Sequence, residues 1–198
     1  MTTRDPLYAA SNYVEQNGTR TVIGGEIDIV TGGKLKINGT DLTSAVNAVA
    51  NDAARYVGAG STKTLTAANN KQVIFLDTAT GSTVTLPAAS GSGNRFRFVV
   101  TVKAASNSHV IQVANGSDFM IGSIHGISDD PATVKGWIAA NSGTVSTNSD
   151  TITLNRSTTG SVSVGEIIEV EDIAANTWLV TGAITQSGTE ATPFSAAV

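Results

Sequence analysis

The chain has 198 residues, of which only 14% are charged and 5% aromatic, with a net charge of -4; a typical globular protein has about 25% charged residues. No run of Lys and Arg occurs, which argues against nucleic-acid binding, and no stretch approaches the roughly 18 consecutive apolar residues of a membrane-spanning helix. Cysteine is absent, which excludes a disulfide framework, a thiolate metal site and a cysteine nucleophile.

Residues 1–20 form a polar stretch without a hydrophobic period, and we interpret them as an extended N-terminal arm. Fully extended, this arm reaches about 65 Å, enough to cross onto a neighbouring subunit. The rings of Tyr8 and Tyr13 bury a large area at low entropy cost, which favours docking over an ordinary frayed terminus. The arm lacks the apolar core of a signal peptide, so we expect a soluble protein made in the cytosol.

Residues 21–57 are predicted to form a short β base followed by one short helix. Ile27 and Ile29, and then Leu35 and Ile37, alternate with polar residues as in half-buried strands. Two Gly-Gly pairs separate these strands and suit corners at which a strand stacks on another layer. Two such units are too few for a solenoid, so a partner chain could supply the missing layer.

The helix predicted at the end of this base has apolar residues spaced four, three, four and three apart, as in a coiled-coil seam. They are Leu42, Val46, Val49, Ala53 and Tyr56. An isolated helix of about 15 residues is marginal in water, so it either packs on the rest of its own chain or associates with copies of itself. The seam fits a trimer no worse than a dimer, and Gly58 and Gly60 are expected to end the helix.

Residues 61–198 are almost wholly β in pattern, with many short strands separated by Gly, Ser and Asn, which indicates a sandwich or jelly roll. In NRFRFVV, residues 94–100, the alternation predicts Phe96 and Phe98 on one face and arginines on the other. Asn115-Gly116 predicts a hairpin turn. Trp178 and Val180 are expected in a last strand that closes the core.

No constellation of catalytic residues emerges. His125 with Asp129 and Asp130 resembles a small metal or acid-base cluster, with His125 on a loop, but aspartates before a proline more often form a turn. Glu169 and Glu171 share one face of a strand, which we interpret as an exposed face instead of a glycosidase pair. The sequence therefore predicts no enzyme, no metal site and no cofactor.

Two long stretches resemble a domain of tailed-phage capsid decoration, cement or head-fibre proteins. They are TLTAANNKQVIFLDTATGSTVTLPAASGSGNRFRFVV at residues 64–100 and GEIIEVEDIAANTWLVTG at residues 165–182. TVIGGEIDIVTGGKLKINGTDL, residues 21–42, is similar to the base segment of phage head-fibre proteins. Residues 123–143 have no counterpart in the resemblance, and Asn176-Thr177-Trp178 departs from its turn pattern.

The resemblance implies a structural virion protein on the outer surface of a phage capsid, bound to the major capsid protein as a homotrimer. In that arrangement Arg4, Leu7, Tyr8 and Tyr13 of the arm contact the capsid, the helical seam forms the oligomer interface, and residues 61–198 project outward as a β-sandwich. The alternative is a fibre or receptor-binding protein that recognises host surface glycans. Trp137 would then be its exposed aromatic contact, with Trp178 in the core.

Overall fold

The computed structural model describes residues 13–14, 21–22, 34, 36–37, 40–41, 55–129, 133–142, 144 and 147–198. The chain divides into two compact units, Met1–Asp52 and Ala53–Val198. The second unit begins eight residues before the outer domain expected from the sequence, because residues from 56 onward already belong to its sheets.

The first unit contains two short antiparallel ladders among its described residues. β1 (Tyr13–Val14) pairs with β2 (Thr21–Val22), and β3 (Lys36–Ile37) pairs with β4 (Thr40–Asp41). The predicted boundary between arm and base, at residue 20, therefore falls between two paired strands. β3 lies where alternation around Ile37 predicted a strand.

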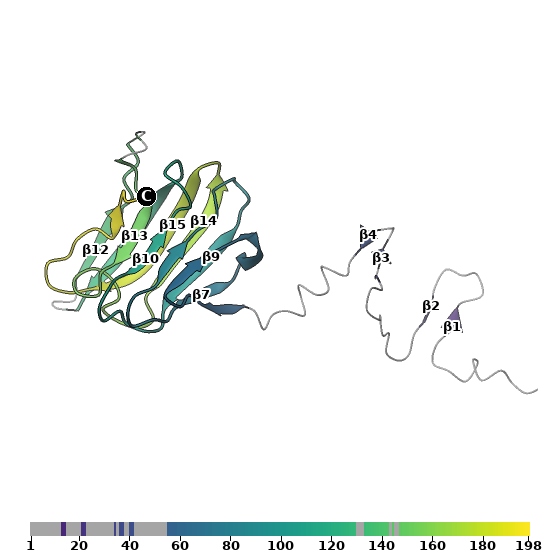
Figure 1. Cartoon of the computed structure of the whole chain (residues 1–198), viewed down its shortest axis with the longest axis horizontal. Coiled ribbons are helices and arrows are strands. Elements are labelled where there is room, and N and C mark those ends of the chain that lie inside the picture. Colours follow the sequence, from purple (N-terminus) through teal and green to yellow (C-terminus); the bar gives the residue numbers. More distant parts are fainter. Residues whose placement is uncertain are drawn as a thin grey trace, which may run out of the picture. The chain divides into compact units, whose positions relative to one another are not determined.

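The second unit is a sandwich of two mixed sheets, which confirms the mainly β class and the sandwich architecture (Figure 1). The seven-stranded sheet has the order β12-β11-β15-β14-β9-β7-β5 and the five-stranded sheet has the order β16-β13-β10-β8-β6. The first sheet comprises β5 (Tyr56–Gly58), β7 (Val73–Leu76), β9 (Arg95–Val100), β11 (Phe119–Ser128), β12 (Val134–Ile138), β14 (Ile167–Ala174) and β15 (Thr177–Gln186). The second comprises β6 (Thr62–Thr64), β8 (Thr83–Thr85), β10 (His109–Gln112), β13 (Thr151–Leu154) and β16 (Phe194–Ser195), and a 3-10 turn, η3 (Ala67–Asn69), follows β6.

The first half of this unit winds as a two-layer coil. Successive strands from β5 to β10 alternate between the two sheets, so that β5, β7 and β9 stack in parallel in one layer and β6, β8 and β10 in the other. The second half adds antiparallel pairs, of which β14 with β15 is the longest. Antiparallel pairing of β9 with β14 joins the two halves of the seven-stranded sheet, and β11 pairs with β15 in parallel over ten residues.

The core lies between the two sheets and follows the predicted alternation. Phe96 and Phe98 are buried, whereas Arg95 and Arg97 on the same strand are exposed. Trp178 is fully buried, as predicted, and its ring lies 5.9 Å from that of Phe96. Such a pair of large rings contributes both buried area and a favourable ring contact to stability.

The hairpin predicted at Asn115-Gly116 is wrong. β10 and β11, on either side of this turn, belong to different sheets. The Asn115 side chain accepts hydrogen bonds from the backbone N–H groups of Ser117 and Asp118, at 2.9 and 3.2 Å. Asn115 and Gly116 therefore form a turn as predicted, but this Asx turn carries the chain from one sheet to the other.

The prediction of a closing last strand at Trp178 is also wrong in its position. β15 lies between β11 and β14 inside the seven-stranded sheet, and the strand that follows it, β16, lies at the edge of the other sheet. Gly122 of β11 has φ +111°, and a Cβ added there would strike the carbonyl oxygen of Val180 on β15. Glycine at this position permits the close approach of β11 and β15.

Residues 123–143, which had no counterpart in the resemblance, supply most of β11 and the whole of edge strand β12. The predicted helix is wrong at its C-terminal end, because Tyr56 and Val57 lie in β5 and Gly58 is the last residue of that strand. Leu42, Val46, Val49 and Ala53 lie outside the described residues.

Candidate functional site

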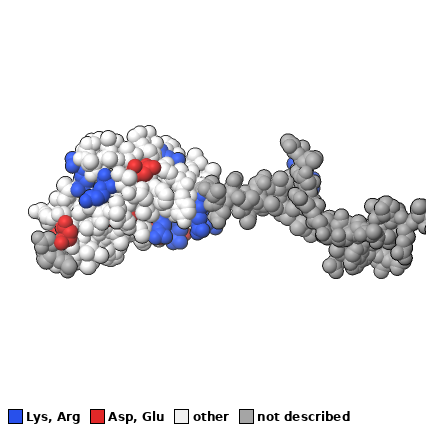
Figure 2. All heavy atoms as spheres, turned by 90° about the horizontal axis from the view of Figure 1, so that it is seen from below, with Lys and Arg blue, Asp and Glu red and all other residues white. Residues whose placement is uncertain are grey.

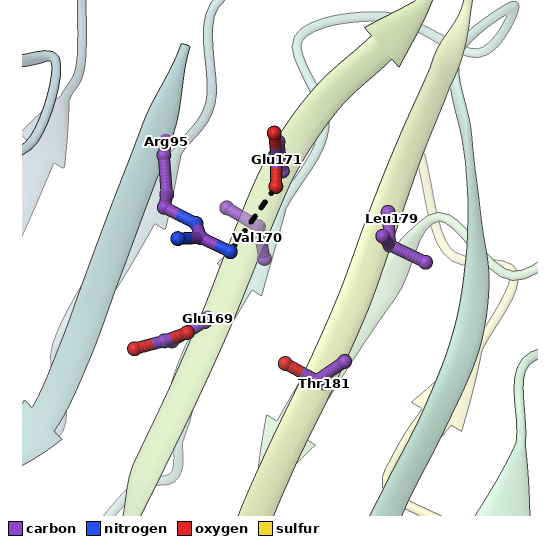
Figure 3. Close-up of a pocket in the computed structure, with 6 residues that line it drawn as sticks. All are labelled: Arg95, Glu169, Val170, Glu171, Leu179 and Thr181. Carbon is purple, nitrogen blue, oxygen red and sulfur yellow. Dashed lines mark ion pairs between the residues drawn. The ribbon is translucent and has the colours of Figure 1, made fainter. Parts of the chain in front are cut away.

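A shallow pocket lies on the outward face of the seven-stranded sheet, over β9, β14 and β15 (Figure 3). Strand register places its side chains together, because Glu171 is opposite both Arg95 and Leu179. Glu169 is likewise opposite Thr181 on β15. Residues two apart on a strand point to the same face, so both rows project outward.

Two ion pairs cross from β9 to β14 at this pocket. Arg95 Nη2 lies 3.3 Å from Glu171 Oε2, and Arg97 Nε lies 3.6 Å from Glu169 Oε1. Their side chains are about one third to three fifths exposed, so solvent screens both pairs and each contributes at most about 1 kcal/mol to stability. The prediction that Glu169 and Glu171 occupy an exposed face is confirmed.

The pocket offers chemistry for binding. Each carboxylate is already paired with an arginine on an open surface, so the two do not form the enclosed acid and base that glycoside cleavage requires. The guanidinium of Arg95 and the hydroxyl of Thr181 provide polar contacts, and Leu179 provides an apolar one. Polar and apolar contacts are thus offered side by side on an open surface.

The same outward face carries a band of half-buried apolar side chains beside the pocket. Phe75, Val99 and Ile167 lie side by side on β7, β9 and β14. Tyr56 on β5 stacks on Phe75 with the ring centres 5.5 Å apart and remains 60% exposed. Tyr56 was predicted in a helical seam; it lies instead at the edge of this apolar band.

The residues predicted to contact a capsid lie in the first unit. Tyr13 is in β1, where it pairs with Val22. Arg4, Leu7 and Tyr8 lie outside the described residues.

Of the set His125, Asp129 and Asp130, which the sequence analysis weighed as a cluster and interpreted as a turn, the structure describes His125 and Asp129. His125 is an exposed residue of β11 and is not on a loop, which corrects the sequence interpretation. Asp129 follows the end of this strand, and Asp130 lies outside the described residues. Within the described ranges, no group of three His, Cys, Asp or Glu side chains is placed to hold a metal ion.

Trp137 is not the exposed aromatic contact that the glycan alternative expected. It is half-buried and packs against the core, because it lies opposite the fully buried Ile124 in the ladder between β11 and β12. The side chain that points outward at this end of β12 is that of Ile138, which is 80% exposed.

Two buried polar side chains fix the backbone inside the sandwich. His109 Nδ1 accepts a hydrogen bond from the Ser82 backbone N–H at 3.0 Å, so its Nε2 carries the proton and donates to the Val102 carbonyl at 2.9 Å. Burial lowers the pKa of His109, against smaller opposite effects of the Val102 hydrogen bond and the Asp77 charge. Glu166 accepts hydrogen bonds from two backbone N–H groups in residues 161–163, yet burial dominates and raises the pKa of its carboxyl.

A carboxylate clamp that the sequence did not reveal holds the loop of residues 90–93. Asp172, 1% exposed, accepts hydrogen bonds from the backbone N–H groups of Ser90, Gly91 and Ser92 and from both serine hydroxyls. The loop itself is rich in Ser and Gly. The Asp172 carboxylate that holds the loop lies 80 to 82 residues further along the chain, on β14. No local sequence pattern predicts a contact at that separation.

No protein-family model, curated protein or solved structure matches the chain. Among the described residues, no helix has the length and apolar character needed to cross a membrane.

Proposed function

We propose that the protein is a structural virion component that binds the outer surface of a phage capsid as a homotrimer and stabilises the head. The observation that carries the proposal is the division into Met1–Asp52 and the larger unit Ala53–Val198. A small attachment unit followed by a β-sandwich is the organisation expected of a protein that anchors at one end and projects at the other.

The surface chemistry of the sandwich supports an assembly role. Its described surface is mostly uncharged in Figure 2, in keeping with a sequence that is only 14% charged. The band around Phe75 and the exposed ring of Tyr56 add apolar area on the seven-stranded sheet. Large apolar or weakly charged surfaces are typical of sites at which proteins associate.

A trimer suits this role because icosahedral shells present threefold positions. A symmetric cap bound to three copies of the major capsid protein gains avidity, since each bound arm raises the effective concentration of the next. Individually weak contacts through Arg4, Leu7, Tyr8 and Tyr13 would then suffice to clamp neighbouring capsomers.

The test compares phage heads with and without this protein. Heads that carry it should retain DNA to a higher temperature, and the double variant Tyr8→Ala with Tyr13→Ala should bind heads more weakly. Arg95→Ala, in the pocket of the second unit, is the matched control and should bind normally. Equal heat resistance of complete and deficient heads would overturn the stabilising role.

Glycan recognition is a second candidate, and the pocket of Arg95, Glu171, Leu179 and Thr181 is the observation that favours it. Neighbouring donors and acceptors next to an apolar side chain match the alternating faces of a sugar. Binding to a glycan array that Arg95→Ala abolishes would support this function. An array without any bound glycan would count against it.

A further inference from the structure

Strand β12 is the outermost strand of the seven-stranded sheet and has one open edge (Figure 1). Ala139 N donates to Gly122 O at 3.0 Å and Ser128 N donates to Thr133 O at 2.8 Å, which fixes the phase of the ladder with β11. Backbone groups alternate in direction along a strand, so those of residues 134, 136 and 138 point away from β11. Among the described residues, none of these three has a backbone partner on the outer side.

The side chains along this edge favour contact with another protein surface. Val134 is 67% exposed and Ile138 is 80% exposed, and both project from the outward face. Between them lies Gly136, which offers no side chain to block an approaching backbone. Native edge strands are normally protected by charge, proline or a bulge; here neither proline nor bulge interrupts β12.

The one charge on the edge is neutralised within the chain. Lys135 Nζ forms an ion pair with Glu190 Oε2 at 2.5 Å, and the Glu190 side chain is only 9% exposed. This hydrogen bond from Lys135 lowers the pKa of Glu190, so the carboxylate stays ionised opposite the lysine. Two copies can therefore approach edge to edge without an unbalanced lysine on either strand.

We propose that β12 pairs antiparallel with β12 of a second copy of this chain, about a twofold axis at Gly136. In that register Gly136 faces Gly136, and Val134 of each copy faces Ile138 of the other. A twofold interface requires such self-complementarity, in which each contact occurs twice. The groups at 134, 136 and 138 are the outward-pointing ones, so the register uses every free N–H and C=O of the edge.

This pairing joins the seven-stranded sheets of the two copies into one continuous sheet. Val134 and Ile138 of both copies form a continuous apolar strip across the axis, and on the opposite face Lys135 of each copy is opposite the partner's Trp137. The area covered is on the order of several hundred Å², below that of a stable dimer, so the contact is weak unless many copies are held close together. It goes beyond the proposed function and does not rest on trimer formation.

Single cysteines test the register directly, because the chain has none of its own. A Cβ at Gly136 would lie 3.7 Å from the His125 ring, an ordinary contact, so Gly136→Cys fits the fold. Opposed residues of this kind lie about 5.5 Å apart between Cα atoms, within the range that a disulfide spans. Under mild oxidation, the full-length Gly136→Cys variant should form a covalent dimer on a denaturing gel.

Ile138→Cys is the matched control on the same strand. Its two copies would lie about 14 Å apart along the paired strands, too far for a disulfide. A mixture of Val134→Cys and Ile138→Cys chains of different tag length should instead give the mixed dimer, which also covers the case that Gly136→Cys folds poorly. Glu190→Gln should reduce Gly136→Cys cross-linking several-fold by freeing the lysine charge.

Two results would overturn the pairing: Ile138→Cys cross-linking to itself as fast as Gly136→Cys, or no mixed dimer from the Val134→Cys and Ile138→Cys chains. Capsid binding and trimer mass are measured separately, so they can fail while the cross-link forms, and the reverse also holds.

Discussion

Replacement of Asp172 by asparagine should unfold the sandwich at markedly lower temperature. The Asp172 carboxylate receives hydrogen bonds from three backbone N–H groups and two hydroxyls, at 2.6 to 3.3 Å. An asparagine keeps one acceptor oxygen and replaces the other with an NH₂ donor. In either orientation this NH₂ faces a backbone N–H, of Gly91 or of Ser92, whose hydrogen bond is lost.

The expected loss follows from the strength of hydrogen bonds to a buried charge. Each contributes about 1.5–3 kcal/mol, and an unpaired buried donor adds a penalty of similar size, so Asp172→Asn should cost about 2–4 kcal/mol of unfolding free energy. For a unit of this size that corresponds to a fall in Tm of roughly 5–15 °C.

Urea unfolding and calorimetry of the full chain measure the effect, with Asp129→Asn as the control that removes an exposed carboxylate. Burial alone raises the pKa of Asp172, but the hydrogen bonds from Ser92, Ser90 and Gly91 outweigh it and leave the pKa below the ordinary 3.8. The stabilisation is therefore present above pH 3.8 and is lost as the pH falls through the lowered pKa, so the gap between wild type and variant should narrow in acid. A loss below about 0.5 kcal/mol at neutral pH, similar to that of an ordinary surface substitution, would refute the clamp.

Three further substitutions test the packing, the buried histidine and the surface ion pair of the sandwich. Gly122→Ala should lower the free energy of unfolding by about 2–4 kcal/mol, as measured by urea unfolding. The control Gly188→Ala, also at positive φ but in open space, should cost only about 1 kcal/mol. Equal losses would contradict the close approach of β11 and β15. Folding lowers the pKa of His109, so as the pH falls the unfolded chain takes up a proton near pH 6.5 before the folded one, and the free energy of unfolding should decrease below pH 6.5. His109→Gln should lack this dependence of stability on pH between about pH 7.5 and about pH 5.5. An unchanged pH dependence in the variant would contradict a lowered pKa of His109. Arg95→Ala should change the unfolding free energy by less than about 1 kcal/mol, and a larger loss in calorimetry would mean that its ion pair is not screened as its exposure indicates.

The strands of the second unit could be predicted because alternation reports burial directly. Phe96 and Phe98 occupy the core and their arginine neighbours the surface, as the period of two required. The pairing partners could not be predicted, because periodicity is the same for parallel and antiparallel neighbours. The parallel coil of β5 to β10 and the interior position of β15 between β11 and β14 therefore had to come from the structure.

Two predictions were wrong because a local sequence pattern is compatible with two different structures. Asn115-Gly116 forms a turn as expected, but a turn can join two strands of one sheet or carry the chain between sheets. Tyr56 continued a heptad spacing, yet β-branched and aromatic residues beside glycine also suit a strand, and pairing with Val73 on β7 decided the matter.

Only part of the candidate site could be predicted from the sequence. The charges of Glu169 and Glu171 on one outward face could be predicted, but their arginine partners could not, since those depend on the register between β9 and β14. The clamp at Asp172 and the open edge of β12 likewise depend on which distant segments meet.

The absolute mass of the purified full-length protein, by light scattering coupled to size exclusion at several concentrations, tests the central claim most directly. Association as a homotrimer predicts a stable species near three times 20.2 kDa at low concentration. If the mass of that species doubles at high concentration, and Ile138→Lys abolishes the doubling, the result also supports the β12 contact. A strict monomer at every concentration would contradict a preformed trimer.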